Sequence, residues 1–343
     1  MEPTGRFTKW ARWARQFAAP STPAFLDRRR SPFWVLVHKE MRDHISSWRF
    51  IILLGLMVLT AIGSLYTAMA NIRSAIAEDE TTSFVFLKLF TATDGTLPPF
   101  ITFVSLLGPL IGIALGFDAV NAERSKGTLA RLMAQPVPRD TIINAKFVAG
   151  LLVVAIMMLV LGFLTIGMGI LMIGIPPTVE EFFRIVLFLL VSIVYIGVWL
   201  NLAIMFSILF KQAATSALSC LAVWLFFTLF FAMVVNLIIG ATAPTEITDV
   251  EQLIGYQGFV QNILRISPSQ LYSEVTTTLL VPTVFTLGPI TIEQAYGYVP
   301  GPLPLGQSVL LIWPQLTGLV AAACVIFAIA YRIFMKQEIR SRS

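Results

Sequence analysis

Six long runs of apolar residues, separated by shorter polar or charged segments, dominate this sequence. Their approximate bounds are 50–70, 100–122, 147–173, 182–210, 213–239 and 309–331. Each run is long enough to cross the apolar core of a bilayer as a helix, which takes about 20 residues. The pattern therefore predicts an all-α integral membrane protein with six transmembrane helices.

Composition and charge support this prediction and add an orientation. Of the 343 residues, 57% are hydrophobic and 13% are charged, whereas a soluble domain of this size is far more polar. With these six spans, 20 of the 24 Lys and Arg residues fall on the side that holds both termini. Because basic loops stay in the cytoplasm, both termini are expected inside, as an even number of spans requires. The net charge of +5 then reflects topology and anionic lipid, and no nucleic-acid partner is needed to explain it.

The segment before the first span has two parts. Residues 1–30 are basic, and their aromatic residues recur at helical spacing, which predicts either an amphipathic helix at the membrane surface or a disordered cytoplasmic segment. An organellar transit peptide is a further alternative for this Arg-rich start. Residues 31–343 are expected to form a single six-helix transmembrane domain. Within it, Ser31 and Pro32 predict the start of an interfacial helix over residues 32–48.

A charged island, residues 116–146, separates the second and third apolar runs. Gly127 interrupts the preceding helix, and Thr128 is placed to cap a new one. The residues that then share one apolar face are Leu129, Leu132 and Met133. Prolines at 136 and 138 end this segment. The island therefore predicts a short amphipathic helix at the cytoplasmic surface, suited to docking in the groove of a partner.

The order of residue types in this island resembles a known family. The residues that carry the resemblance are Asp118, Glu123, Arg124, Gly127, Thr128, Leu129, Leu132, Pro136, Val137, Arg139 and Lys146. They resemble the loop between the second and third spans in ABC transporter permeases of the type-2, exporter-like class. Lys39-Glu40-Met41 is likewise similar to the motif of the elbow helix in that class. The alternative is an ordinary set of positively charged anchors with a helix break.

The resemblance implies that the island holds a coupling helix that sits on a cytoplasmic ATPase. The implied contact residues are Glu123, Arg124, Gly127, Thr128, Leu129, Arg131, Leu132, Met133, Pro136 and Arg139. It further implies a pair of such chains, or one chain with a similar permease, above two ATPase subunits that bind ATP and Mg. Within the class the chain looks most like stand-alone permeases of the plasma membrane of bacteria and archaea, including those serving nitrous-oxide reductase maturation or sodium and drug export. Faces of the first, second and fifth spans would line the route.

The residues themselves offer little catalytic chemistry. The sequence lacks a P-loop, a Ser/His/Asp set and an H-E-x-x-H motif, and His38 and His44 are six positions apart, so they do not share a helical face. We therefore expect no bound cofactor or metal and no enzymatic activity in this chain alone, with energy coming from a separate subunit. The polar candidates for a translocation path are Thr60, Ser64, Tyr66 and Asn201, whose alternative role is hydrogen bonding between helices. The rival functions are a non-transporting assembly factor, a scaffold for extracytoplasmic partners, and a membrane-embedded enzyme.

Three further patterns complete the prediction. Residues 240–307 form a long extracytoplasmic segment with seven prolines, expected to contain short half-helices and to serve an extracytoplasmic partner or a gate, or else to be disordered. Glycines at 108, 112 and 116 predict a close approach of another helix to the second span. Cys220 and Cys324 lie inside apolar runs and are expected to be buried and unpaired.

Overall fold

The computed structural model describes residues 31–77, 84–134, 137–174, 176–242, 250–284, 286–287 and 301–337. All regular structure in these ranges is helical, which confirms the all-α prediction. The predictions for residues 1–30 and for Pro136 lie outside the described residues.

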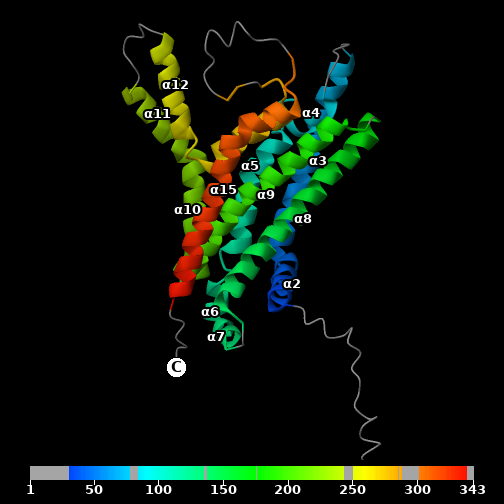
Figure 1. The fold of residues 1–343 in the computed structure, drawn as a ribbon. Helices are drawn as coiled ribbons and strands as arrows, with labels where there is room; N and C mark the ends of the chain where they lie inside the picture. The colour runs from blue at the N-terminus through cyan, green and yellow to red at the C-terminus, as the bar shows by residue number, and fades with distance from the viewer. Residues whose placement is uncertain are drawn as a thin grey trace, which may run out of the picture.

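Six stretches are long and apolar enough to cross a membrane, as predicted, and they run side by side in Figure 1. Their helices are α3 (Trp48–Ala77), α5 (Phe100–Gly116) with α6 (Asn121–Ser125), α8 (Arg139–Ile173), α9 (Val179–Leu209), α10 (Ala213–Leu225) continued by η1 (Phe226–Phe230) and α11 (Phe231–Thr242), and α15 (Leu305–Lys336). The third helix begins eight residues before its predicted start, so Arg139 and Lys146 lie on α8 and not in the loop.

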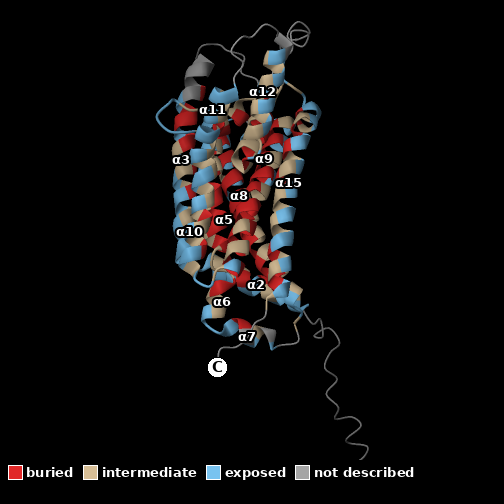
Figure 2. Ribbon diagram, turned by 90° about the vertical axis from the view of Figure 1, so that its left-hand side faces the viewer, coloured by how far each residue is buried: buried red, intermediate tan, exposed pale blue. Residues whose placement is uncertain are grey.

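Helix α9 lies at the centre of the bundle and contacts α5, α8, α13 and α15. Figure 2 shows that buried residues concentrate on α5, α8 and α9, whereas α10 and α15 are mostly exposed or half-buried. The predicted glycine strip explains the contact between α5 and α9. A Cβ atom at Gly112 would lie 2.7 Å from the backbone oxygen of Ile196, and one at Gly116 would lie 2.8 Å from that of Leu200. Only glycine allows the two backbones to approach this closely.

The bundle has two distinct ends (Figure 1). One end, here called the loop end, carries α2 (Pro32–Ile45), α6, α7 (Thr128–Met133) and the C-terminal end of α15. The other, here called the hairpin end, carries α4 (Val85–Thr91) and the helices α12 (Val250–Leu264) and α13 (Pro268–Leu280). Short half-helices interrupted by prolines were predicted for this outer segment, and α12 and α13, the second of which begins at Pro268, are two such helices.

Helix α2 packs along the first turns of α8. Val37 is buried against Ala145 and Ala149, which makes a small apolar cluster at the loop end. Ser31 occupies the predicted cap position, but its side chain makes no capping hydrogen bond. The predicted interfacial helix over residues 32–48 ends earlier, at Ile45, and Trp48 begins α3 with 75% of its surface exposed.

The hairpin end is held by two buried charged residues at the start of α9. Arg184 is fully buried and donates to the carbonyl oxygens of Leu279 (3.0 Å) and Leu303 (2.5 Å), while pairing with Glu180. Glu181 accepts from the backbone N–H of Phe86 at 2.9 Å and completes a capping box with Thr178. The sequence pattern marked Arg184 only as one of four basic residues on the outer side, so its burial was not anticipated.

The two cysteines differ in their surroundings. Both are free, as predicted, and Cys220 is buried. The expectation of burial is wrong for Cys324, which is exposed on α15 because that helix covers only one side of the bundle.

Candidate functional site

The connection between α5 and α8 folds into two short helices at the loop end. Helix α6 is anchored from α9 by Ser207, whose fully buried hydroxyl accepts hydrogen bonds from the N–H groups of Val120 (2.9 Å) and Asn121 (3.1 Å). These are unpaired donors at the N-terminus of a helix, which a neighbouring oxygen must satisfy. No sequence pattern pointed to Ser207, because its partners lie 86 and 87 positions away.

Helix α7 forms where the charged island predicted a helix. Gly127 adopts a φ of +68°, a left-handed conformation that separates α6 from α7. Thr128 donates to the carbonyl oxygen of Glu123 at 3.2 Å. Leu129 is buried in the protein's own core and Leu132 is half-buried against it, whereas Arg131 is exposed. Leu129 and Leu132 therefore turn toward the bundle, whereas Thr128 and Arg131 are exposed. The side chain of Met133, the third residue of the predicted apolar face, is outside the described part of the structure.

A cluster of two lysines and two glutamates ties the island to α2 and α8; we call it the loop-end ion cluster. Its residues are Lys39, Glu40, Glu123 and Lys146. The ammonium of Lys146, whose side chain is only 3% exposed, lies 2.9 Å from Glu123 and 3.1 Å from Glu40. Lys39 lies 2.8 Å from Glu40 and 3.3 Å from Glu123 on the more exposed side. Since a lysine is rarely buried unless it is paired, the two carboxylates account for the burial of Lys146.

The electrostatic balance of this cluster keeps Glu40 ionised. Burial alone would raise the pKa of the Glu40 carboxyl, but the nearby ammonium groups of Lys146 and Lys39 outweigh it, and the pKa is lowered. The second carboxylate oxygen of Glu123 is buried and has no hydrogen-bond partner among the described residues. The elbow motif and the end of the island were recognised separately in the sequence, and the structure joins them.

Two further contacts brace the island. Arg49, at the start of α3, pairs with Asp118 at 2.7 Å and lies 4.8 Å above the ring of Phe117. On the other side, Arg124 donates to the side-chain oxygen of Gln337 at the end of α15, and Arg139 donates to the backbone oxygen of the same residue at 3.4 Å. Glu123 and Arg124 were expected to contact a partner ATPase, and that contact stays a prediction. In the single chain both side chains also bond to residues of neighbouring helices.

A charged cleft of about 510 Å³ opens between α2, the start of α3 and the island. Its walls include the loop-end ion cluster, and its α7 side is formed by Thr128, Arg131 and Leu132. Arg131 makes no ion pair or hydrogen bond with the described part of the chain. The cleft therefore places the exposed, unpaired charge of Arg131 beside the loop-end ion cluster.

No hydrogen bond among the described residues joins the four polar candidates for a translocation path to one another. Thr60 and Ser64 donate to carbonyl oxygens of their own helix, at 3.0 and 3.1 Å. Tyr66 is 73% exposed, and Asn201 donates to the carbonyl oxygen of Ala323 on α15 at 3.1 Å. Asn201 thus makes the interhelical hydrogen bond that was the alternative interpretation.

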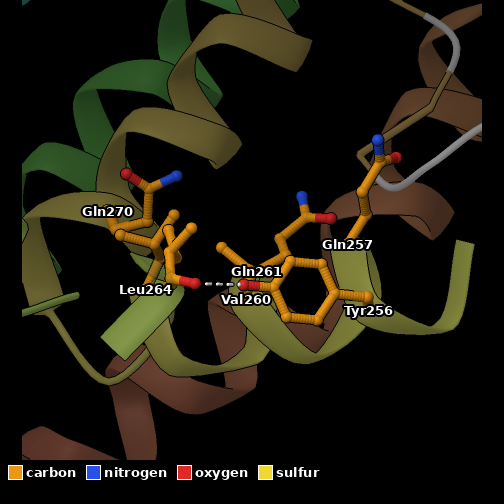
Figure 3. A pocket seen from close by; sticks show the side chains of 7 residues that line it. Tyr256, Gln257, Val260, Gln261, Leu264 and Gln270 are labelled. Carbon is orange, nitrogen blue, oxygen red and sulfur yellow. Dashed lines mark hydrogen bonds between the residues drawn. The ribbon is translucent and has the colours of Figure 1, made fainter. Parts of the chain in front are cut away.

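A second cavity, of about 390 Å³, lies at the hairpin end between α11 and α12 (Figure 3). Its polar lining comes from Tyr256, Gln257, Gln261 and Gln270. The Tyr256 hydroxyl donates to the carbonyl oxygen of Ile239 at 2.9 Å, which joins α12 to α11. Across the described residues, no group of three or more His, Cys, Asp or Glu side chains is placed to hold a metal ion.

Comparisons with known proteins agree with the architecture. A family model described as "ABC-2 family transporter protein" matches residues 34–339. The chain is similar to a probable ABC transporter permease protein NosY of Pseudomonas aeruginosa, 27% identical over 242 residues, which cover 66% of this chain and 82% of that relative. It is also similar to a protein of the same description from Stutzerimonas stutzeri, 28% identical over 188 residues, covering 50% of this chain and 66% of that relative. Because the family match runs through all six candidate spans, this chain belongs to the ABC-2 family of transporter proteins and is a multi-pass membrane component of an ABC transporter.

Proposed function

We propose that this chain forms the translocation path of an ATP-driven exporter and receives the motion of a separate ATPase through its loop end. In this proposal two ATPase subunits bind ATP and Mg, and this chain hydrolyses nothing itself. The loop end faces the cytoplasm of a bacterium or archaeon, together with both termini. The distribution of Lys and Arg residues, 20 of 24 on that side, supports this orientation.

The observation that carries the proposal is the position of α7, which follows the tightly bonded helix α6 and exposes Arg131. The loop-end ion cluster ties α6, which precedes α7, to α2 and to the membrane-spanning helix α8, so a displacement of α7 is passed through α6 to both helices. Arg131 is exposed beside the charged cleft and has no partner within the described residues. A rigidly mounted helix with an unpaired cation is suited to bind an acidic surface of a partner.

The test replaces the exposed cation without touching the core. We expect Arg131→Glu to reduce capture of the cognate ATPase by about tenfold or more, because truncating an interface anchor costs about 2 kcal/mol and charge reversal adds repulsion. The measurement is pull-down of the purified ATPase together with its hydrolysis rate in vesicles that contain this chain.

Lys211→Glu is the matched control. Lys211 is an exposed cation in the short turn between α9 and α10, a different connection of the loop end from the one that holds α7. It is expected to leave capture unchanged. Equal capture by the wild type and Arg131→Glu would contradict the proposed docking role of α7.

We further propose that two copies, or one copy and a similar permease, meet through the fifth span. In the most apolar 18-residue stretch of this span only 17% of the residues are buried. Asn236 lies on its exposed surface between Met233 (61% exposed) and Leu237 (74% exposed). An amide facing lipid is costly, so a protein partner on this face is the more stable arrangement.

Cysteine cross-linking in membranes tests this pairing. In a chain carrying Cys220→Ala and Cys324→Ala, we expect Leu237→Cys to form a disulfide-linked pair on oxidation. Leu171→Cys is the control, because Leu171 is 86% exposed on α8 near the same end of the bundle. Equal cross-linking at both positions would point to random collision and against a specific interface.

The segment over residues 240–307 is proposed to serve an extracytoplasmic partner or a gate. This proposal is supported by the contacts that α13 makes with α9 and α15. Limited proteolysis from the outer face of intact vesicles checks it, because rapid cutting throughout the segment would indicate disorder.

A further inference from the structure

Gln337, the residue after α15, lies where four separate parts of the loop end meet. Its side-chain oxygen accepts from Arg124 of α6, and its side-chain nitrogen donates to the carbonyl oxygen of Ile208 at 2.9 Å. Its backbone oxygen accepts from Arg139 at the start of α8 at 3.4 Å. One amide side chain and its own carbonyl thus join α6, α8, α9 and α15.

We propose that Gln337 is a positioning residue that transmits displacement of the island to the sixth span. The inference rests on the proposed function, because it names the path by which motion delivered to α7 leaves the island. It adds α15 to the helices that respond, whereas the loop-end ion cluster reaches only α2 and α8.

Two consecutive residues of α6 bond to different helices, which supports two separate routes by which motion leaves the island. Glu123 and Arg124 are consecutive residues of the five-residue helix α6. Glu123 bonds to Lys39 of α2 and to Lys146 of α8, whereas Arg124 bonds to Gln337 at the far end of the chain. Because α6 is a single short helix, a movement of its backbone pulls on both sets of contacts together.

The hydrogen bond from Gln337 to Ile208 ties the same set of contacts to the end of α9. Ile208 belongs to the last turn of α9, where carbonyl oxygens have no partner within the helix. The amide of Gln337 satisfies one of them, and Ser207 beside it anchors the N-terminus of α6. The end of α9 therefore contacts both α6 and the end of the sixth span. Gln337 makes the contact on the side of α15.

The hydrogen bond to Arg124 makes it possible to tell a transmitting role of Gln337 from a role in packing alone. A guanidinium donates to an amide or a carboxylate oxygen, and a charge-assisted hydrogen bond of this kind is stronger than a neutral one. Glutamate at position 337 keeps the acceptor for Arg124 and loses the donor to Ile208. Leucine has a similar volume and loses both.

The test uses the full chain with its cognate ATPase in lipid vesicles. The variants are Gln337→Leu, Gln337→Glu, Arg124→Leu and the double variant Arg124→Leu with Gln337→Leu. Lys336→Ala is the matched control, because Lys336 is the adjacent exposed residue. The measurements are capture of the ATPase and the rate of ATP hydrolysis relative to the free ATPase.

We expect Gln337→Leu to reduce stimulated hydrolysis by about twofold to thirtyfold, the range for residues that carry coupling, with capture unchanged. Gln337→Glu should recover most of the rate, and the double variant should be no slower than the slower single variant. Normal hydrolysis with Gln337→Leu, an equal loss with Gln337→Glu, or loss of ATPase capture would each overturn the inference. Failure of the proposed function looks different, because the wild-type chain itself would then neither capture nor stimulate the ATPase.

A distance measurement covers the outcome in which Gln337→Leu is poorly folded. Spin labels at Lys126→Cys and Lys336→Cys, in a chain with Cys220→Ala and Cys324→Ala, report the separation of the island from the end of α15. We expect this separation to stay constant between the nucleotide-free and ATP-trapped states while other distances from the island change. A change in this separation in the otherwise wild-type chain would overturn the inference.

Discussion

The fourth and fifth spans have nearly the same length and the same hydropathy, yet they occupy opposite environments. Val179–Leu209 and Ala213–Thr242 contain 31 and 30 residues, and the apolar 18-residue stretch of each has a mean hydropathy of 2.5. In the most apolar stretch of each, 67% of the residues are buried in the fourth span and 17% in the fifth. Hydropathy therefore identifies both as spans but does not tell which one forms the centre of the protein.

Small and hydrogen-bonding residues account for the difference. Helix α9 meets the glycine strip of α5 and makes side-chain hydrogen bonds to neighbouring elements through Ser192, Tyr195, Asn201 and Ser207. The fifth span contains a π-helical turn at Phe226–Phe230, and of its residues only Ser216, Cys220 and Val235 are fully buried. Because lipid tails are as apolar as Leu, helices associate in membranes through close packing and hydrogen bonds. These features give α9 its central place.

The largest effect is expected where the two backbones of α5 and α9 touch. In Gly112→Val the new Cβ would lie 2.7 Å from the oxygen of Ile196 and 2.9 Å from the nitrogen of Leu200, and backbone atoms cannot move aside cheaply. We expect a loss of about 3 kcal/mol in the free energy of unfolding, at the upper end of the usual cost of overpacking. Unfolding by SDS in mixed micelles measures it.

Gly240→Val on α11 is the control for this prediction. A Cβ at Gly240 meets nothing within 4 Å, so its effect on unfolding of the single chain should stay within about 0.5 kcal/mol. If the two glycine variants lose similar free energies of unfolding, the fourth and fifth spans are packed equally tightly in the membrane, contrary to the comparison.

A smaller effect is expected from the hydroxyl at the loop end of α9. Ser207→Ala leaves the N–H groups of Val120 and Asn121 without their acceptor in a buried place. Two unsatisfied donors should lower the free energy of unfolding by about 2 kcal/mol. Thr215→Ala is the matched variant on the fifth span, because that exposed hydroxyl bonds only to the carbonyl of Gln212. If the two variants are equally stable in the SDS titration, α6 is not held through Ser207.

Much of the fold could be predicted because apolar run length and proline are local signals. The six spans, the helix break at Gly127, the short helices within residues 240–307 and the glycine contact all follow from residues close together in sequence. The fully buried state of Arg184 could not be predicted in this way. Its partners at Leu279 and Leu303 are backbone oxygens about 95 and 119 positions away, and any residue type offers such an oxygen.

The sequence predicted most residues of the candidate site, but not how they are arranged in space. The patterns around Glu40 and Glu123 were both noticed, but only the fold brings them within reach of Lys146. The direction of α7 was the least predictable feature, since a helical stripe of Leu129 and Leu132 is the same whether it faces a partner or its own core. Gln337 carried no signal at all, because a single Gln after a long apolar run matches no motif.

The smallest effects come from two asparagines, one on each of the compared spans, and they should differ in kind. Asn201→Leu on α9 removes a hydrogen bond to Ala323, worth about 0.6 kcal/mol on average between membrane helices. It also removes a buried amide oxygen that has no partner among the described residues, so the net loss in the free energy of unfolding should be at most about that size.

Asn236→Leu on α11 should leave unfolding of the single chain unchanged, since its side chain is exposed and touches no buried core. If a second copy covers this face, the substitution removes polar contacts between copies, and pairing should weaken while folding stays intact. Energy transfer between labelled copies, followed as the chain is diluted in lipid vesicles, measures pairing separately from the SDS titration. Unchanged energy transfer for Asn236→Leu would mean that lipid and not a second copy lies against this amide. The fifth span would then be peripheral in the assembly as well as in the single chain.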